Sequence, residues 1–202
     1  EKMFVRSAQL ATDAFPAYLC ACQAAQAQLA MQRAEDYLVL SETPANRLAV
    51  QLTRVRLWID SGQWEAAVSS LKTLYTHDRK EPLIAELLLQ SLIKLKSWQE
   101  VMELLPQLSK TIANVQSSAS LIEAYQRSLS WLAETGNRVD KVATLKRLRD
   151  FWATLPTFVK HNMDVVYSYA EAVIAIGFDE EAEELLRVSL GQQWHNGLVE
   201  LY

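Results

Sequence analysis

The chain has 202 residues, half of them hydrophobic, and a formal net charge of -4. Its acidic and basic residues are interspersed, which argues against nucleic-acid binding, because such surfaces need a basic stripe. No stretch of about 18 uncharged apolar residues occurs, so no segment of the sequence reads as a membrane-spanning helix. Only five Gly and five Pro are present, which favours long helices joined by short turns.

The predicted helices begin with residues 1–12, which read as the tail of an upstream helix. Asp13 is the expected N-cap of the next helix, with Pro16 in its first turn. Five helix pairs are then expected, over residues 14–42, 46–76, 81–110, 118–155 and 162–190.

Glycine and proline residues indicate where the helices of these pairs end or are interrupted. Gly62 fits the position after a helix that needs a positive φ, and Gly177, at the matching place in the fifth pair, is expected to form its turn. Pro106 lies inside the second helix of the third pair and should kink or shorten it. The polar residues 111–118 break the pattern, and Gly136-Asn137 are expected to form the turn of an irregular fourth pair.

The fifth pair is regular again, with a second helix from Asp179 whose acidic first turn suits the positive end of a helix. The tail QQWHNGLVELY begins a further element.

The pattern returns about every 34 residues, which is typical of tetratricopeptide (TPR) helix pairs. Trp64 and Trp98 occupy matching places in successive repeats, and Ala67 matches Val101. The sequence therefore predicts an all-α, TPR-like solenoid of about five antiparallel helix pairs, spanning residues 1–202 as a single array. Both ends read as the boundaries of a longer protein.

Large and reactive side chains are expected to be structural. Trp64 and Trp98 should form inter-helix core, whereas Trp194 falls outside the register and either packs on a further repeat or is partly exposed. Cys20 and Cys22 point about 200° apart on a helix, so they read as small buried hydrophobes and not as a disulfide.

Three segments resemble the HemY-type TPR proteins of proteobacteria: residues 48–74, 97–110 and 180–202. The opening EKMFVRSAQLA and the run YLCACQAAQAQ are also similar to the family's first repeat region. The chain departs from the family in its first turn, where glycine and tyrosine give way to Leu29 and Met31. That departure bears on the geometry of the first repeat.

The resemblance implies a right-handed array and a role associated with late haem (protoporphyrin) biosynthesis. It also implies anchoring in the bacterial inner membrane through two N-terminal helices that this chain lacks, with the present region on the cytoplasmic side. Late haem-biosynthesis enzymes are then the candidate protein partners. The family shares its name with an unrelated oxidase, and that name does not indicate oxidase activity.

No catalytic motif is visible, so we expect no enzymatic activity. The sequence has no nucleophile elbow, phosphate-binding loop or dinucleotide fingerprint. Cys20, His77 and His161 are candidate haem ligands by residue type only, without a haem-attachment motif around them. We expect no cofactor and no metal.

A partner-binding groove is the remaining hypothesis, because the first helix of each TPR pair lines the concave face. The expected groove residues, counted back from the turns, are Leu52, Arg56, Asp60, Glu86, Gln90, Lys94, Tyr167 and Glu171. Arg56 is the leading candidate, since arginine binds carboxylates bidentately. Arg54 points instead toward the neighbouring helix, where it should satisfy a buried carbonyl or acid.

Three functions stay open at this point. The first is a protein–protein scaffold for haem biosynthesis, the second a general TPR adaptor for another complex, and the third a porphyrin-binding carrier. An adaptor binds through groove residues such as Arg56, whereas a carrier needs a ligand such as His77 or Cys20.

Overall fold

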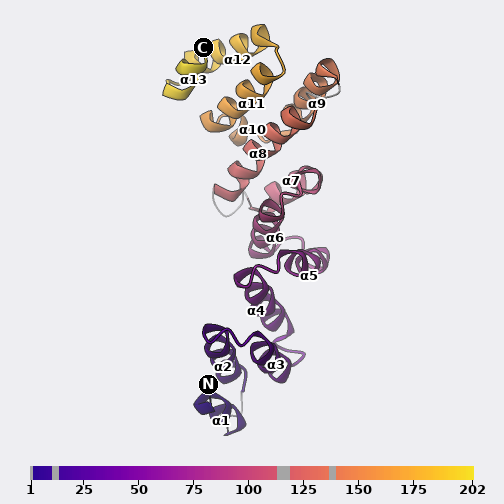
Figure 1. Ribbon diagram of the computed structural model, residues 1–202, viewed down its shortest axis with the longest axis vertical. Helices are drawn as coiled ribbons and strands as arrows, with labels where there is room; N and C mark the ends of the chain where they lie inside the picture. Colours follow the sequence, from indigo (N-terminus) through magenta and orange to yellow (C-terminus); the bar gives the residue numbers. More distant parts are fainter. Residues whose placement is uncertain (1, 11–13, 113–118, 137–139) are drawn as a thin grey trace. The chain divides into compact units, whose positions relative to one another are not determined.

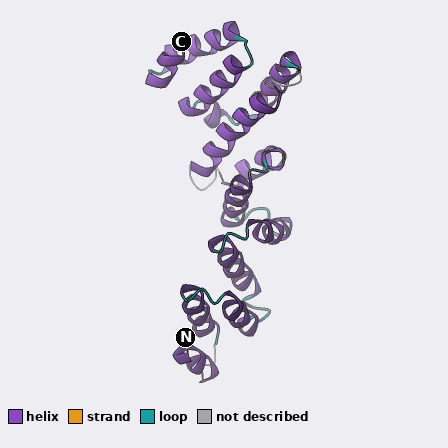
Figure 2. Ribbon diagram, in the orientation of Figure 1, coloured by secondary structure: helices purple, strands orange, loops and turns teal. Residues whose placement is uncertain are grey.

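The computed structural model describes residues 2–10, 14–112, 119–136 and 140–202. Every regular element in these ranges is an α-helix (Figures 1 and 2), so the expected all-α class is confirmed. The chain divides into two compact units, Glu1–Leu74 and Tyr75–Tyr202. A single array that runs through both units stays a prediction.

The first unit holds α1 (Lys2–Leu10), α2 (Phe15–Ala27), α3 (Met31–Ser41), α4 (Arg47–Asp60) and most of α5 (Trp64–His77). Helix α2 packs against both α1 and α3, and α3 packs against α4. The core of this unit consists of Cys22, Ala25, Ala34, Leu38, Val50 and Leu57.

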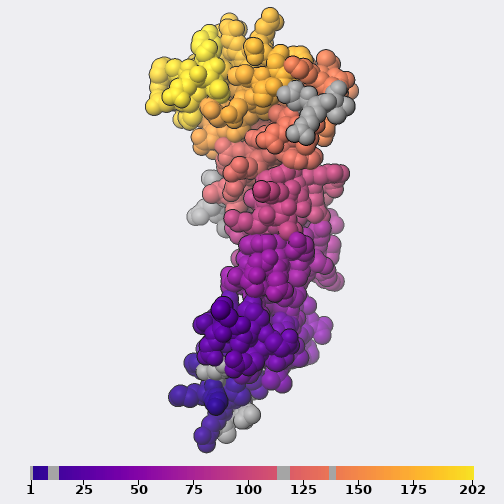
Figure 3. Space-filling view, viewed as in Figure 1, coloured from indigo at the N-terminus to yellow at the C-terminus, as the bar shows by residue number. Residues whose placement is uncertain are grey.

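The second unit continues with helices that pack on their sequence neighbours and on the like helix of the next pair. Helix α8 contacts both α6 and α11, and α11 contacts α12 and α13. Within the unit the surface follows sequence order, from magenta to yellow in Figure 3. The helices are α6 (Pro82–Leu95), α7 (Trp98–Ile112), α8 (Ala119–Gly136), α9 (Lys141–Thr154), α10 (Thr157–Lys160), α11 (Met163–Ala175), α12 (Asp179–Gln192) and α13 (Asn196–Leu201).

Each predicted helix is present within a few residues of its expected bounds, and the tail forms α13. The short helix α10 was not predicted. The proposed cap Asp13 lies outside the described residues, as do residues 113–118 of the expected polar break. Thr111 and Ile112 belong to α7 instead.

Pro106 was expected to kink or shorten α7, but the helix continues past it to Ile112, so the predicted shortening is wrong. Leu105, Leu108 and Ile112 are buried on either side of the exposed proline. Burying three large side chains stabilises the helix by roughly 1.5–3 kcal/mol each, which outweighs the ~3 kcal/mol that an interior proline costs.

Four of the helix pairs are joined by the same turn. Leu29, Gly62, Lys96 and Gly177 have φ of 57°, 75°, 55° and 86°. Each donates its N–H to the carbonyl three residues back, and the next residue donates to the carbonyl five back, with N···O distances of 2.8–3.2 Å. This is the Schellman motif, which satisfies the last carbonyls of the helix. The positive φ predicted for Gly62 is confirmed, and Gly177 and two non-glycine residues adopt it as well.

Burial recurs at fixed distances from that turn. The fifth and ninth residues after the left-handed position are buried in all four pairs, and all eight side chains are at most 2% exposed. A small or β-branched residue at the first position lets the two helices approach, and a leucine at the second fills the space between them. The first of these positions is filled by Ala34, Ala67, Val101 and Ala182. The second is filled by Leu38, Leu71, Leu105 and Leu186.

The fourth pair departs from this pattern. Gly136 is the last residue of α8 and, unlike Gly62 and Gly177, does not have a positive φ. Asn137, its partner in the expected turn, lies outside the described residues. A Cβ at Gly136 would meet the Thr144 side chain of α9 at 2.2 Å, so glycine is needed here for close helix approach. Helix α9 begins at Lys141, where Asp140 accepts hydrogen bonds from the N–H groups of Val142 and Ala143.

Replacing Leu29 by glycine should stabilise the protein. A left-handed conformation costs a non-glycine residue about 1–2 kcal/mol, more than the extra chain entropy of glycine, about 0.5–1 kcal/mol. Leu29 is 87% exposed, so its removal deletes no core contact. We expect Leu29→Gly and Lys96→Gly each to raise the free energy of unfolding by about 0.5–1 kcal/mol. Urea unfolding measures this, and the matched control Gly62→Ala should lower it. An unchanged or lower midpoint for Leu29→Gly contradicts the prediction.

Candidate binding surface

The first helices of the pairs, α2, α4, α6 and α11, present the same four positions in the same way. The positions are counted back along the sequence from the left-handed residue that ends each helix. The side chains ten and three residues before it are half-buried, and the side chains six and two residues before it are exposed. The half-buried positions include Leu52, Glu86 and Tyr167. The exposed positions include Arg56, Asp60, Gln90, Lys94 and Glu171.

The eight predicted groove residues are shared between the two units. Leu52, Arg56 and Asp60 belong to α4 in the first unit, and Glu86, Gln90 and Lys94 to α6 in the second. Tyr167 and Glu171 lie on α11, also in the second unit. That these residues bind a partner stays a prediction.

Polar side chains link successive first helices. In the first unit the Gln26 amide donates to Asp60 Oδ2 at 2.7 Å, joining α2 to α4. In the second unit the Gln90 amide donates to Glu86 Oε1 of its own helix and to Ser120 Oγ of α8. Three of the predicted groove residues are therefore engaged within the protein.

The remaining exposed residues are available to a partner. Among the residues that the structure describes, Arg56, Lys94 and Glu171 have no hydrogen-bond or ion-pair partner. Arg56 is exposed on α4. Tyr167 is less accessible, because its ring packs on the core under α13 and lies next to Gly197.

A pocket of about 320 Å³ lies between α8 and α11. Gln126 of α8 donates to the carbonyl of Asp164 near the start of α11, at 3.2 Å, and ties the two helices at their other end. We call this cavity the α8–α11 pocket; its lining residues are Ser130, Ala133, Glu134, Glu171, Ala172 and Ala175.

Of these residues, only Glu171 was predicted from the sequence. The α8 side was missed because α8 ends without a left-handed glycine from which to count. The apolar periodicity of α8 could have identified them. Its buried stripe from Leu121 to Leu132 defines the core face of the helix, and Ser130 and Glu134 lie outside that face.

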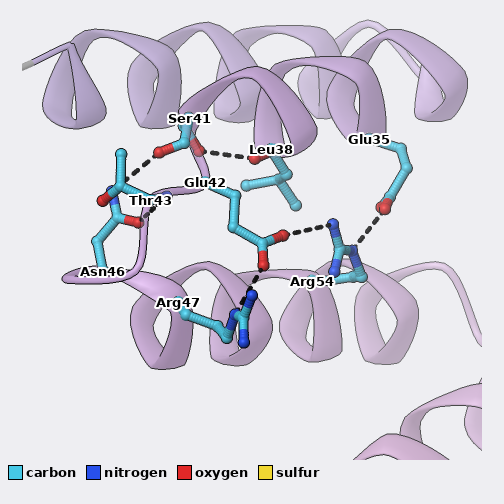
Figure 4. A network of polar contacts seen from close by, with 8 residues as sticks. All are labelled: Glu35, Leu38, Ser41, Glu42, Thr43, Asn46, Arg47 and Arg54. Carbon is cyan, nitrogen blue, oxygen red and sulfur yellow. Dashed lines mark hydrogen bonds and ion pairs between the residues drawn. The ribbon is translucent and has the colours of Figure 1, made fainter.

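Arg54 lies eight residues before the left-handed Gly62. The equivalent positions in the other three regular pairs are filled by Ala21, Leu88 and Tyr169. It is mostly buried, and its guanidinium reaches α3 (Figure 4). Nε donates to Glu35 Oε1 at 2.5 Å, and Nη2 lies 3.9 Å from Glu42 Oε2. The expectation that Arg54 satisfies an acid of the neighbouring helix is confirmed.

The same network closes the connection between α3 and α4. Arg47 donates to the second carboxylate oxygen of Glu42 at 3.3 Å. The Asn46 side chain donates to the carbonyl of Ser41 and accepts from the N–H of Thr43 (Figure 4). This loop is therefore held by side chains that satisfy backbone groups left free outside the helices.

A second network joins α9, α11 and α12. The Arg149 guanidinium donates to both oxygens of Glu181, at 2.8 Å and 2.5 Å. The buried Tyr169 lies close enough to Glu181 for the charge of that carboxylate to act on its phenol, and its ring centroid lies 4.5 Å from that of Trp152. Burial first, and then the charge of Glu181, raise the pKa of Tyr169 to about 12.

The candidate haem ligands Cys20, His77 and His161 lie on or beside different helices of the described structure. His161 uses Nδ1 in a 2.7 Å hydrogen bond with the carbonyl of Thr157, and His77 ends α5. Cys22 is buried, which raises the pKa of its thiol, and Cys20 is half-buried. In the described ranges no group of three or more His, Cys, Asp or Glu side chains could hold a metal ion.

The tryptophans are less buried than expected. Trp64 and Trp98 are half-buried, so only part of each ring contributes to inter-helix core. Trp194 is 73% exposed and donates its indole N–H to Asn196. Trp194 therefore does not pack on the described helices, and both alternatives for it stay open.

Comparison with known proteins found no matching family model and no matching solved structure. The chain matches Protein HemY of Escherichia coli strain K12 and of Shigella flexneri, with 23% identity over 201 residues in each case. The chain is HemY-like. The match covers 98% of the chain, which confirms the resemblance seen in the sequence.

The chain spans about half the length of the curated relatives it matches, 49% in each. In the described part of this HemY-like chain, no helix has the length and apolar character that crossing a membrane requires.

Replacing Arg54 should destabilise the first unit. Arg54→Ala leaves the Glu35 carboxylate, one oxygen of which is already buried without a partner in the described structure, with an unpaired charge. We expect a loss of about 2 kcal/mol in the free energy of unfolding, less than for a fully buried pair because both groups reach solvent. Chemical unfolding of Arg54→Ala, Glu35→Ala and the double variant measures this. If the two single losses simply add in the double variant, the ion pair is not the cause.

Tyr169 should make the stability depend on alkaline pH. A phenol with a pKa near 10 when unfolded and about 12 when folded stabilises the native state fully below pH 10. This stabilisation is lost as the pH rises from about 10 to 12, by about 2–3 kcal/mol in total. Unfolding measured across this range should show a shallower fall for Tyr169→Phe than for the wild type. Identical slopes would rule out Tyr169 as the titrating group.

Proposed function

We propose that this HemY-like chain is part of a TPR-like solenoid that binds a segment of a partner protein along its first helices. The proposal rests mainly on one observation. Four helix pairs expose the same two positions on their first helix and bury the same positions on their second. A strip of accessible, alternating polar and apolar side chains on a repeated scaffold suits an extended or helical peptide.

The contacts between like helices support the solenoid arrangement. Helices α6, α8 and α11 of the second unit contact one another in order, as the first helices of consecutive repeats do. The second helices α9 and α12 are joined through Arg149 and Glu181. Each pair thus contacts mainly its neighbours, which is the organisation of repeat proteins.

We further propose that the partner belongs to late haem biosynthesis and that the full protein is held at the bacterial inner membrane, with this region on the cytoplasmic side. The similarity to Protein HemY supports this assignment. Binding, and not catalysis, is the proposed activity, because the sequence carries no catalytic motif. The runner-up is a TPR adaptor for a different complex, which would use the same surface.

Affinity capture from proteobacterial membranes tests the proposal. The chain is immobilised beside Arg56→Glu, which reverses an exposed charge on the first helix of a pair, and Arg147→Glu, which makes the same change on the exposed face of α9. We expect the wild type and Arg147→Glu to recover late tetrapyrrole enzymes. Arg56→Glu should recover at least about tenfold less, because the hot spots of such interfaces are often arginines.

Other outcomes separate the alternatives. Selective, Arg56-dependent capture of unrelated proteins would favour the general adaptor over the haem assignment. Equal capture by all three proteins would place binding elsewhere than on the first helices. Circular dichroism of each variant checks that its helix content is unchanged.

A further inference from the structure

The α8–α11 pocket has room for one side chain from outside. Its volume is about 320 Å³, and three of its six lining residues are alanines: Ala133, Ala172 and Ala175. Small side chains on both helices leave the space between them open. The methylene stem of a long side chain can lie along such an alanine surface while its polar end reaches the rim.

The pocket is acidic on both sides. Glu134 comes from α8 and Glu171 from α11, and both are exposed. Neither carboxylate has an ion-pair or hydrogen-bond partner among the described residues. No basic residue lines the pocket. Two carboxylates that line one pocket, with no basic side chain among the lining residues, attract a cation placed between them.

The helix ends reinforce this negative potential. Glu134 lies in the last turn of α8, which ends at Gly136, and Ala172 and Ala175 lie in the last turn of α11. The C-terminal end of a helix carries about half a negative charge, which favours Lys or Arg nearby. Helix dipoles and side chains thus act in the same direction at this pocket.

We propose that the α8–α11 pocket receives a basic side chain, an arginine or lysine, from a partner segment that lies along the first helices. This inference rests on the proposed function and adds the chemistry of the partner. Arginine suits the site best, because its planar fork of donors can reach carboxylates on both walls.

Selection from a phage library of random 12-residue peptides tests the inference without a known partner. Peptides enriched on the wild-type chain are synthesised, and their affinities are measured by fluorescence polarisation. The test variant is Glu134→Gln/Glu171→Gln, which keeps the size of both side chains. The control is Glu123→Gln/Glu200→Gln, which removes the same charge from two exposed positions of α8 and α13.

The expected result is enrichment of peptides that contain Arg or Lys and bind the test variant at least tenfold more weakly than the wild type and the control. Peptides that bind all three proteins equally, or that lack a basic residue, overturn the pocket assignment and leave the proposed function standing. A selection that enriches no peptide counts against both.

Discussion

The left-handed residue that ends the first helix of each regular pair is the constraint on which the rest of the structure depends. Leu29, Gly62, Lys96 and Gly177 all adopt this conformation, and two hydrogen bonds close each turn. Because the turn fixes where the second helix starts, it also fixes which residues of that helix face the first. The burial of a small or β-branched residue five positions later, and of a leucine nine positions later, follows from this geometry.

The same turn determines the candidate binding surface, because side chains counted back from it alternate between half-buried and exposed. Where these side chains pair with each other, as Gln26 does with Asp60, they connect neighbouring helices. Where they have no partner in the described structure, as with Arg56, Lys94 and Glu171, they are available to another protein. Repetition of one turn thus gives each regular pair the same buried positions on its second helix and the same accessible positions on its first.

The sequence predicted the helices well because apolar periodicity and glycine punctuation act locally. It did not predict that Leu29 and Lys96 would adopt a left-handed conformation, since the packing of the flanking helices overrides the preference of a single residue. Pro106 does not shorten α7, because the burial of an apolar stripe compensates for one lost hydrogen bond; whether it kinks the helix stays a prediction. It missed Glu134, because Gly136, the glycine that ends α8, does not adopt the left-handed conformation from which the other positions were counted. The packing of α8 on α11 brings Glu134 and Glu171 to the same pocket.

The backbone conformation at Leu29 and Lys96 tests the central claim most directly. NMR scalar couplings together with intraresidue amide–Hα nuclear Overhauser effects report φ at each residue. A common turn predicts a positive φ at both positions, near the 57° and 55° of the structure. A negative φ at either residue would mean that the turn depends on glycine. The four regular pairs would then not share one turn from which their buried and exposed positions can be counted.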